Sequence, residues 1–209
     1  MDQGGGPIRL MGVLALNPAT FEEIADDTGA IRGALLTVIV ATLLAGLGGL
    51  LWTQWGGQPP TRAIYQTDVQ RFIARSVLAG GALQIVAWAA LVGVTFWYLR
   101  SFGVETSLGR LARVMGYAFA PMAIQVLICP PGLEFAMGAV ALGYTFAALV
   151  AGVQAASGTT AGRSAVSVLA GFAMMVVLLG LLGNGTSDLA PGIFALDPLP
   201  TSVGIKTLR

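Results

Sequence analysis

The stretch Leu111–Cys129, LARVMGYAFAPMAIQVLIC, decides the fold of this chain. It is apolar enough to lie inside a bilayer, yet it carries Tyr117 and Gln125 and is interrupted by Pro121. A proline has no N–H to donate, so it removes one helical hydrogen bond and bends the helix. The stretch therefore predicts a kinked membrane-spanning helix. Four other long apolar runs, two before it and two after it, are predicted to pack around it.

Each of the five apolar runs is long enough to cross a membrane. About 20 residues, each rising about 1.5 Å along a helix, cover the roughly 30 Å of the hydrocarbon core. A soluble domain carries about 25% charged residues, whereas this chain has 10% charged and 56% hydrophobic residues. The sequence therefore predicts an all-α fold, an integral membrane five-helix bundle. Its spans are expected at residues 33–52, 77–99, 111–129, 133–154 and 164–183.

The segments outside the spans are predicted to be short helices and a tail. Residues 1–32 begin with a glycine-rich stretch, residues 1–8, whose tip we expect to be disordered. Asn17, followed by proline, then predicts the start of a short amphipathic helix over residues 18–28, resting at the membrane edge or on another part of the protein. Residues 61–76 predict an interfacial helix, or an extension of the second span. Residues 184–209 contain prolines and are expected to be extended.

Small residues in the spans predict close packing between helices. In lipid there is no hydrophobic drive between helices, so small side chains that allow van der Waals contact mark the interfaces. The fourth span contains Gly138, Gly143, Ala147 and Ala151, and we expect it at the centre of the bundle. Three glycines near the end of the first span, Gly46, Gly48 and Gly49, are expected to allow a similar close approach.

Polar residues within the spans are few. Gln84 and Gln125 are the uncharged polar residues that lie deepest, and a buried amide in lipid needs a partner. We expect the two amides to pair as a structural feature; the alternative is that they line a substrate pathway. Tyr117 and Pro121 are four residues apart and would share a helical face. They predict a static kink or, as the alternative, a hinge or a notch facing lipid or a ligand.

The sequence offers little for catalysis. Histidine is absent, Cys129 is the single cysteine, and Glu134 is the only acid close to an apolar run. General acid–base, nucleophilic and zinc chemistry therefore lack their usual groups. The chain has neither a phosphate-binding loop nor a dinucleotide fingerprint, and its net charge of +1 gives no basic stripe for nucleic acid. We predict that the protein is not an enzyme, needs no cofactor or metal, and binds no nucleic acid.

The arginines near the spans predict how the chain is oriented. Five spans place the two chain ends on opposite sides of the membrane, and positive charge is enriched on the cytoplasmic side. Five arginines flank the spans on the N-terminal side and three on the other side, namely Arg32, Arg100, Arg110, Arg113 and Arg163 against Arg62, Arg71 and Arg75. A cytoplasmic N-terminus is therefore predicted.

The third span also carries a family motif. Gly116-Tyr117-Ala118-Phe119-Ala120-Pro121 resembles the Gly-Tyr-x-Leu-x-Pro motif of the Ypt-interacting-protein (Yip) family of five-span membrane proteins, with Phe119 in place of Leu. The opening Leu16-Asn17-Pro18-x-x-Phe21-x-x-Ile24-Ala25 is similar to the start of prokaryotic members, and the resemblance covers roughly residues 14–182.

A second family motif, Asp-Leu-Tyr-Gly-Pro, has no counterpart in this chain. Eukaryotic relatives bind prenylated Rab-type GTPases and act in vesicle traffic. The missing motif argues against that role, and the resemblance implies a prokaryotic member in the bacterial inner membrane.

Two functions are compatible with these features. The first is a non-catalytic, membrane-organising scaffold or partner-binding subunit, in contact with the lipid bilayer and with other membrane proteins or a second copy of itself. The alternative is a small transporter or channel for a lipid or a neutral solute, using the Tyr117–Pro121 notch and the two glutamines. A continuous polar cavity between the spans would favour transport, and a dry, packed bundle would favour the scaffold.

Overall fold

The structure, a computed structural model, describes residues 5–55, 80–128, 130 and 132–183. Within these ranges every regular element is helical, as the sequence predicts. Five stretches are long and apolar enough to cross a membrane. The interfacial helix expected at residues 61–76 and the extended tail at 184–209 lie outside the described residues. In chain order the helices are α1 (Gly5–Leu14), α2 (Pro18–Asp26), η1 (Thr28–Ala30), α3 (Ile31–Trp55), α5 (Gly80–Ser101), α6 (Leu108–Tyr117), η4 (Ala120–Ile128), α7 (Glu134–Ser157) and α8 (Ala161–Gly183).

The N-terminal segment folds into two short helices, although only the second was predicted. The expected disorder of the tip is wrong from Gly5 onward, where α1 begins. The start of α2 confirms the prediction, because the side chain of Asn17 accepts a hydrogen bond from the N–H of Ala19 at 3.1 Å. Phe21 and Ile24 of α2 are fully buried. Helix α2 contacts α6 and α7, so it rests on the protein itself.

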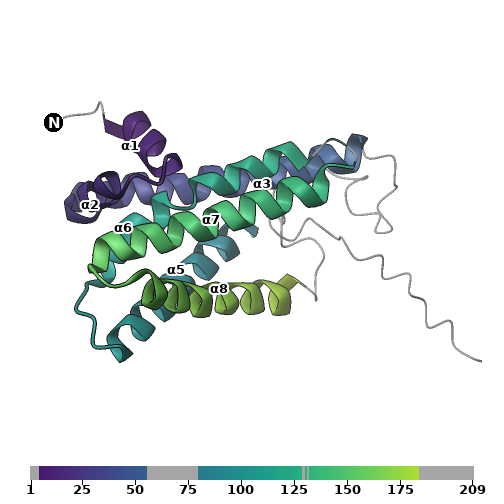
Figure 1. Cartoon of the computed structure of the whole chain (residues 1–209). Helices are drawn as coiled ribbons and strands as arrows, with labels where there is room; N and C mark the ends of the chain where they lie inside the picture. The colour runs from purple at the N-terminus through teal and green to yellow at the C-terminus, as the bar shows by residue number, and fades with distance from the viewer. Residues whose placement is uncertain (1–4, 56–79, 129, 131, 184–209) are drawn as a thin grey trace, which may run out of the picture.

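The long helices form two connected groups (Figure 1). In the first group, α3 and α7 pack against the third span, which consists of α6 and η4. In the second group, α5 packs along α8, and the Thr95 hydroxyl donates a hydrogen bond to the carbonyl of Ser167 at 3.3 Å. A side chain at Gly171 would approach the carbonyl oxygen of Leu91 to 2.6 Å, so this glycine permits the close crossing. Contacts of α7 with α8 and of α5 with α6 join the two groups.

The third span is the most buried of the five. In this span 61% of the most apolar 18-residue window is buried, against 28–39% in the other four. The prediction that the fourth span lies at the centre is therefore wrong. Bulky side chains explain the difference, because Met115, Phe119 and Met122 of the third span fill the space between the neighbouring helices and are at most 1% exposed. The small residues of α7 fill less space and leave part of that helix exposed.

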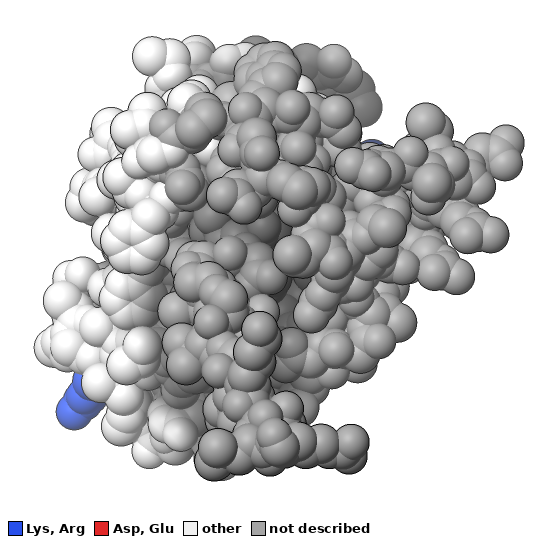
Figure 2. Space-filling view, turned by 90° about the vertical axis from the view of Figure 1, so that its right-hand side faces the viewer, with Lys and Arg blue, Asp and Glu red and all other residues white. Residues whose placement is uncertain are grey.

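The outer surface of the bundle is apolar. Large hydrophobic side chains are exposed on α3, α7 and α8, for example Leu36 (60%), Phe135 (75%) and Leu169 (58%). On the face shown in Figure 2, the described residues are almost all uncharged, and no acidic side chain is in view among them. Such a surface belongs in hydrocarbon, because a soluble protein rarely exposes large apolar patches. The chain is an integral, multi-pass membrane protein.

Candidate functional site

The third span is interrupted where the family-like motif lies. Helix α6 starts after Ser107, whose hydroxyl accepts a hydrogen bond from the N–H of Arg110 at 3.2 Å. The helix ends at Tyr117, and the N–H of Phe119 then donates to the carbonyl of Gly116 at 3.2 Å. From Ala120 the chain continues as a 3₁₀-helix of 9 residues. The break therefore falls within the motif, before the proline.

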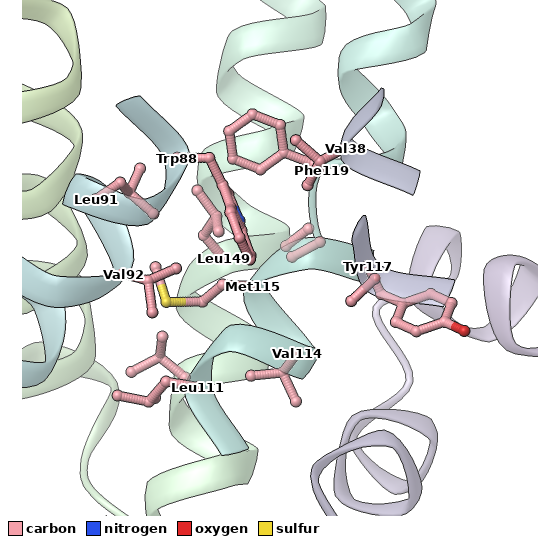
Figure 3. Close-up of a cluster of buried hydrophobic side chains, with 14 of the residues drawn as sticks. Val38, Trp88, Leu91, Val92, Leu111, Val114, Met115, Tyr117, Phe119 and Leu149 are labelled. Atoms are coloured by element: carbon pink, nitrogen blue, oxygen red, sulfur yellow. The ribbon is translucent and has the colours of Figure 1, made fainter. Parts of the chain in front are cut away.

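Only part of this geometry could be predicted from the sequence. Pro121 cannot donate to the carbonyl of Tyr117, so the loss of one helical hydrogen bond was predictable. The sequence predicted one kinked helix, whereas the chain resumes as a 3₁₀-helix, a conformation that seldom runs beyond about four residues. Tyr117 and Pro121 consequently belong to different helices and do not share a helical face. Both are buried, and Tyr117 is directed away from the apolar cluster around Met115 (Figure 3).

Two motif residues fit the small residues at the start of α3. A Cβ added to Gly116 would lie 2.6 Å from the Cβ of Ala34, so the two helices touch there at backbone distance. The ring of Tyr117 lies on Gly33, where a side chain would overlap its hydroxyl group. Tyr117 is 5% exposed and Ala34 is fully buried. This part of the motif therefore positions α6 against α3.

The same two spans make close contact again further along. A Cβ added to Gly48 of α3 would overlap the carbonyl oxygen of Gln125 and lie 2.8 Å from the Cα of Val126. The contact involves the backbone of η4, so a change of rotamer cannot relieve it. The close approach expected at Gly48 is thus present in the structure, and its partner is the third span.

Phe119, which stands where the family motif has Leu, lies in the core. Its side chain is fully buried and lies beside Val38 of α3 and Trp88 of α5 (Figure 3). A phenyl ring fills more volume than a leucine side chain, and Phe119 belongs to one buried apolar cluster with Val38 and Trp88. Three motif residues, Gly116, Tyr117 and Phe119, are thus engaged in packing inside the bundle.

The predicted pair between Gln84 and Gln125 does not form. Gln125 is fully buried, and neither atom of its amide has a hydrogen-bond partner in the structure. Gln84, on α5, is buried as well. The physical reason is the order of the helices, because η4 packs between α3 and α7 whereas α5 packs along α8. The sequence contains no signal for that order. The structure leaves the Gln125 amide as an unpaired polar group at membrane depth.

The small residues predicted to pack on α7 fall into two sets. Gly138 is buried and Ala151 is half-buried within the bundle. Gly143 and Ala147 are exposed, and a Cβ added to Gly143 would meet open space. A close contact on α7 also occurs at Gly152, where a Cβ would lie 3.1 Å from the ring of Phe21.

A charged cluster, absent from the sequence predictions, holds α1 against α2. The guanidinium of Arg9 pairs with Glu23 at 2.8 Å and with Asp27 at 2.7 Å. The hydrogen bond from Arg9 and a second from the N–H of Gly29 at 2.8 Å hold the pKa of Asp27 below its usual value, because they stabilise the ionised carboxylate. The partners are 14 and 18 residues apart, a separation at which sequence spacing carries no signal.

Two further arginines hold the start of α6 against α2. Arg110 pairs with Asp26 at 3.0 Å. The guanidinium of Arg113 donates a hydrogen bond to the carbonyl of Ala25. These contacts and the Arg9 cluster lie at the same end of the bundle, so that end is polar. Within the described residues, no group of three or more Cys, Asp and Glu side chains is placed to hold a metal ion.

These observations define the class of protein and then its family. The fold is a five-span, all-α integral membrane bundle whose most buried span is interrupted at a Gly-Tyr-x-Phe-x-Pro motif. The family model of the Yip1 domain matches residues 11–183. The chain belongs to the Yip1 domain family. No curated protein and no solved structure matches it.

Proposed function

We propose that the protein is a non-catalytic, partner-binding subunit or membrane-organising scaffold of a membrane complex. The proposal rests on the position of the motif, whose residues Gly116, Tyr117 and Phe119 are packed inside the bundle. A motif used in this way maintains a shape and leaves the outer faces of the bundle for contact with lipid and with other proteins. The role assigned here requires no catalytic group and no cofactor.

The outer face of α7 is where we place the partner. Ala139, Gly143 and Ala147 follow one another at four-residue spacing, and all three are exposed. Small side chains at this spacing let a second membrane helix approach closely, which in lipid is a main source of affinity between helices. By contrast, Gly116 and Gly152 are already in contact with Ala34 and Phe21 of the same chain. The partner is another membrane protein or a second copy of this chain.

Photo-cross-linking tests this placement. A photoreactive residue at Ala147, in native membranes, is expected to give a discrete protein adduct. The same residue at Leu36, which is 60% exposed on α3, is the matched control and is expected to react with lipid. Gly143→Leu should abolish the adduct at Ala147 without lowering the melting temperature, because the side chain at that position meets open space. Lipid adducts alone at Ala147, or the same adducts from both positions, would contradict the proposal.

We also propose that the N-terminus is cytoplasmic and that the membrane is the bacterial inner membrane. Support comes from arginine placement, since Arg110 and Arg113 lie at the polar end of the bundle together with α1 and α2. A cysteine at Glu22, which is exposed, should react with an impermeant maleimide only after the cells are opened. The variant should carry Cys129→Ala, because Cys129 is the only native cysteine. Labelling of the cysteine in intact cells would show that the N-terminus lies outside the cytoplasm and would contradict the proposed orientation.

A second candidate, a transporter or channel for a lipid or neutral solute, is favoured by the Gln125 amide. Irregular helices at membrane depth line substrate sites in transporters, and this amide is buried and unpaired in such a segment. Liposomes containing the purified protein would show flux of small neutral solutes that is lost in Gln125→Met although the melting temperature of that variant is not lowered. Equal flux with and without protein would leave the scaffold as the function.

A further inference from the structure

Helix α1 has its charged and apolar sides reversed relative to a helix at a water-exposed surface. Its only charged residue, Arg9, is turned toward the protein, with a side chain 20% exposed and paired to Glu23 and Asp27. Ile8 and Met11, on the other side of the helix, are 73% and 72% exposed, and Leu14 is 40% exposed. In water this arrangement would leave a row of large apolar side chains in solvent while the charge is turned inward.

The position of α1 explains that reversal. In Figure 1, α1 leaves the side of the bundle near its polar end and crosses the direction of α3 and α7 instead of running beside them. It contacts α2, which lies outside the spans, and η4, which lies within one. Helix α1 is therefore at the boundary between the polar end and the membrane-spanning part. Its 10 residues are too few to cross a bilayer, because they cover only about 15 Å.

The attachment of α1 to the bundle is firm. Gly12 packs on Thr20, Val13 is fully buried, and the N–H of Asn17 donates to the carbonyl of Gly12 at 2.9 Å. Leu16, which joins the two helices, adopts a φ of 53°, a left-handed conformation that a leucine keeps only when its surroundings hold it there. The orientation of the exposed face of Ile8 and Met11 is consequently set by the fold.

We propose that α1 is an interfacial membrane anchor, whose Ile8–Met11–Leu14 face is inserted at the boundary between lipid headgroups and acyl chains. The occupant of this face is the bilayer that the spans of the same chain already cross, so the lipid is present beside α1 without any further partner. Amphipathic helices of this kind bind by burying a few large apolar side chains at that depth. Arg9 contributes by fixing the roll of the helix through Glu23 and Asp27. The anchor does not depend on the partner-binding role, because it concerns a different helix.

Site-directed spin labelling of the full chain tests the anchor. In a Cys129→Ala background, single cysteines at Ile8 and Met11 carry a nitroxide, and the protein is reconstituted into liposomes of three parts phosphatidylcholine to one part phosphatidylglycerol. Glu22, exposed on the neighbouring α2, is the matched control. The expected result is several-fold higher accessibility to oxygen relative to a water-soluble nickel chelate at Ile8 and Met11 than at Glu22. Gel filtration and the melting temperature confirm that each labelled protein is folded, and two anchor positions guard against loss of one variant.

Two outcomes would overturn the anchor. Nickel accessibility at Met11 equal to that at Glu22 would place α1 in water. Protection from both reagents would mean that protein covers the face, and spin–spin broadening would then identify a second copy of this chain as the cover.

Discussion

Replacing Gly48 by Ala tests the contact between the first and third spans. The added Cβ would overlap the carbonyl oxygen of Gln125 and lie 2.8 Å and 2.9 Å from two further backbone atoms of the third span. Since those atoms belong to the backbone, α3 and η4 would have to move apart. A displacement of α3 from η4 would also disturb the contact between the Tyr117 ring and Gly33 at the other end of the same interface.

The expected size of the effect combines two opposing terms. Overpacking costs about 1–3 kcal/mol, and we take the upper end because backbone atoms are involved. Alanine is favoured over glycine in a helix interior by about 1 kcal/mol. The net loss is about 2 kcal/mol, which for a chain of this size lowers the melting temperature by about 4–8 °C.

The assay is thermal unfolding of the detergent-solubilised full chain, followed by gel filtration of the remaining folded protein. Gly93→Ala is the matched control, because a Cβ at Gly93 of α5 meets no atom within 4 Å. That variant keeps only the helix-propensity gain of about 1 kcal/mol, so its melting temperature should rise by about 2–4 °C. A Gly48→Ala protein that melts at or above the wild-type temperature would refute the close contact between α3 and η4.

Three further predictions follow from the buried and charged groups. Gln125→Met should raise the free energy of unfolding by about 1–3 kcal/mol in chemical denaturation, because it removes an unpaired buried amide; a loss of stability would mean that the amide has a partner. Phe21→Ala should cost about 3–5 kcal/mol, since its ring is fully buried, whereas Glu22→Ala should change stability by less than about 0.5 kcal/mol. The lowered pKa of Asp27 means that its pairing with Arg9 stabilises the fold above the unfolded pKa of about 3.9 and is lost as the pH falls through the folded value. Hydrogen exchange of residues 5–14, corrected for intrinsic rates, should therefore accelerate below about pH 3.9 in the wild type, and should accelerate less in an Asp27→Asn variant, in which Glu23 is the remaining acidic partner of Arg9.

The parts of the fold that the sequence predicted are those that local chemistry determines. Each span follows from an apolar run matched to the thickness of hydrocarbon, and the start of α2 follows from Asn17 beside a proline. Pro121 indicated that a helical hydrogen bond is missing, but the lost bond does not specify whether the chain resumes as an α-helix or a 3₁₀-helix. The 3₁₀ conformation of η4 depends on its packing against α3, and no local sequence pattern specifies that packing.

The parts that could not be predicted depend on which helices are neighbours. Pairing Gln84 with Gln125 required α5 to lie beside η4, whereas α5 packs along α8. The motif residues Gly116 and Tyr117 were identified by resemblance, and their partners Ala34 and Gly33 became visible only in the structure. The ion pairs of Arg9 could not be predicted either, because its acidic partners lie outside its own helix.

The proposed role as a partner-binding subunit is tested most directly by native mass spectrometry of the protein extracted with its surrounding lipid by a styrene–maleic acid copolymer. We expect a complex of fixed stoichiometry, with a second copy or another membrane protein, that Gly143→Leu converts to the single chain. A single chain for both the wild type and the variant would contradict it.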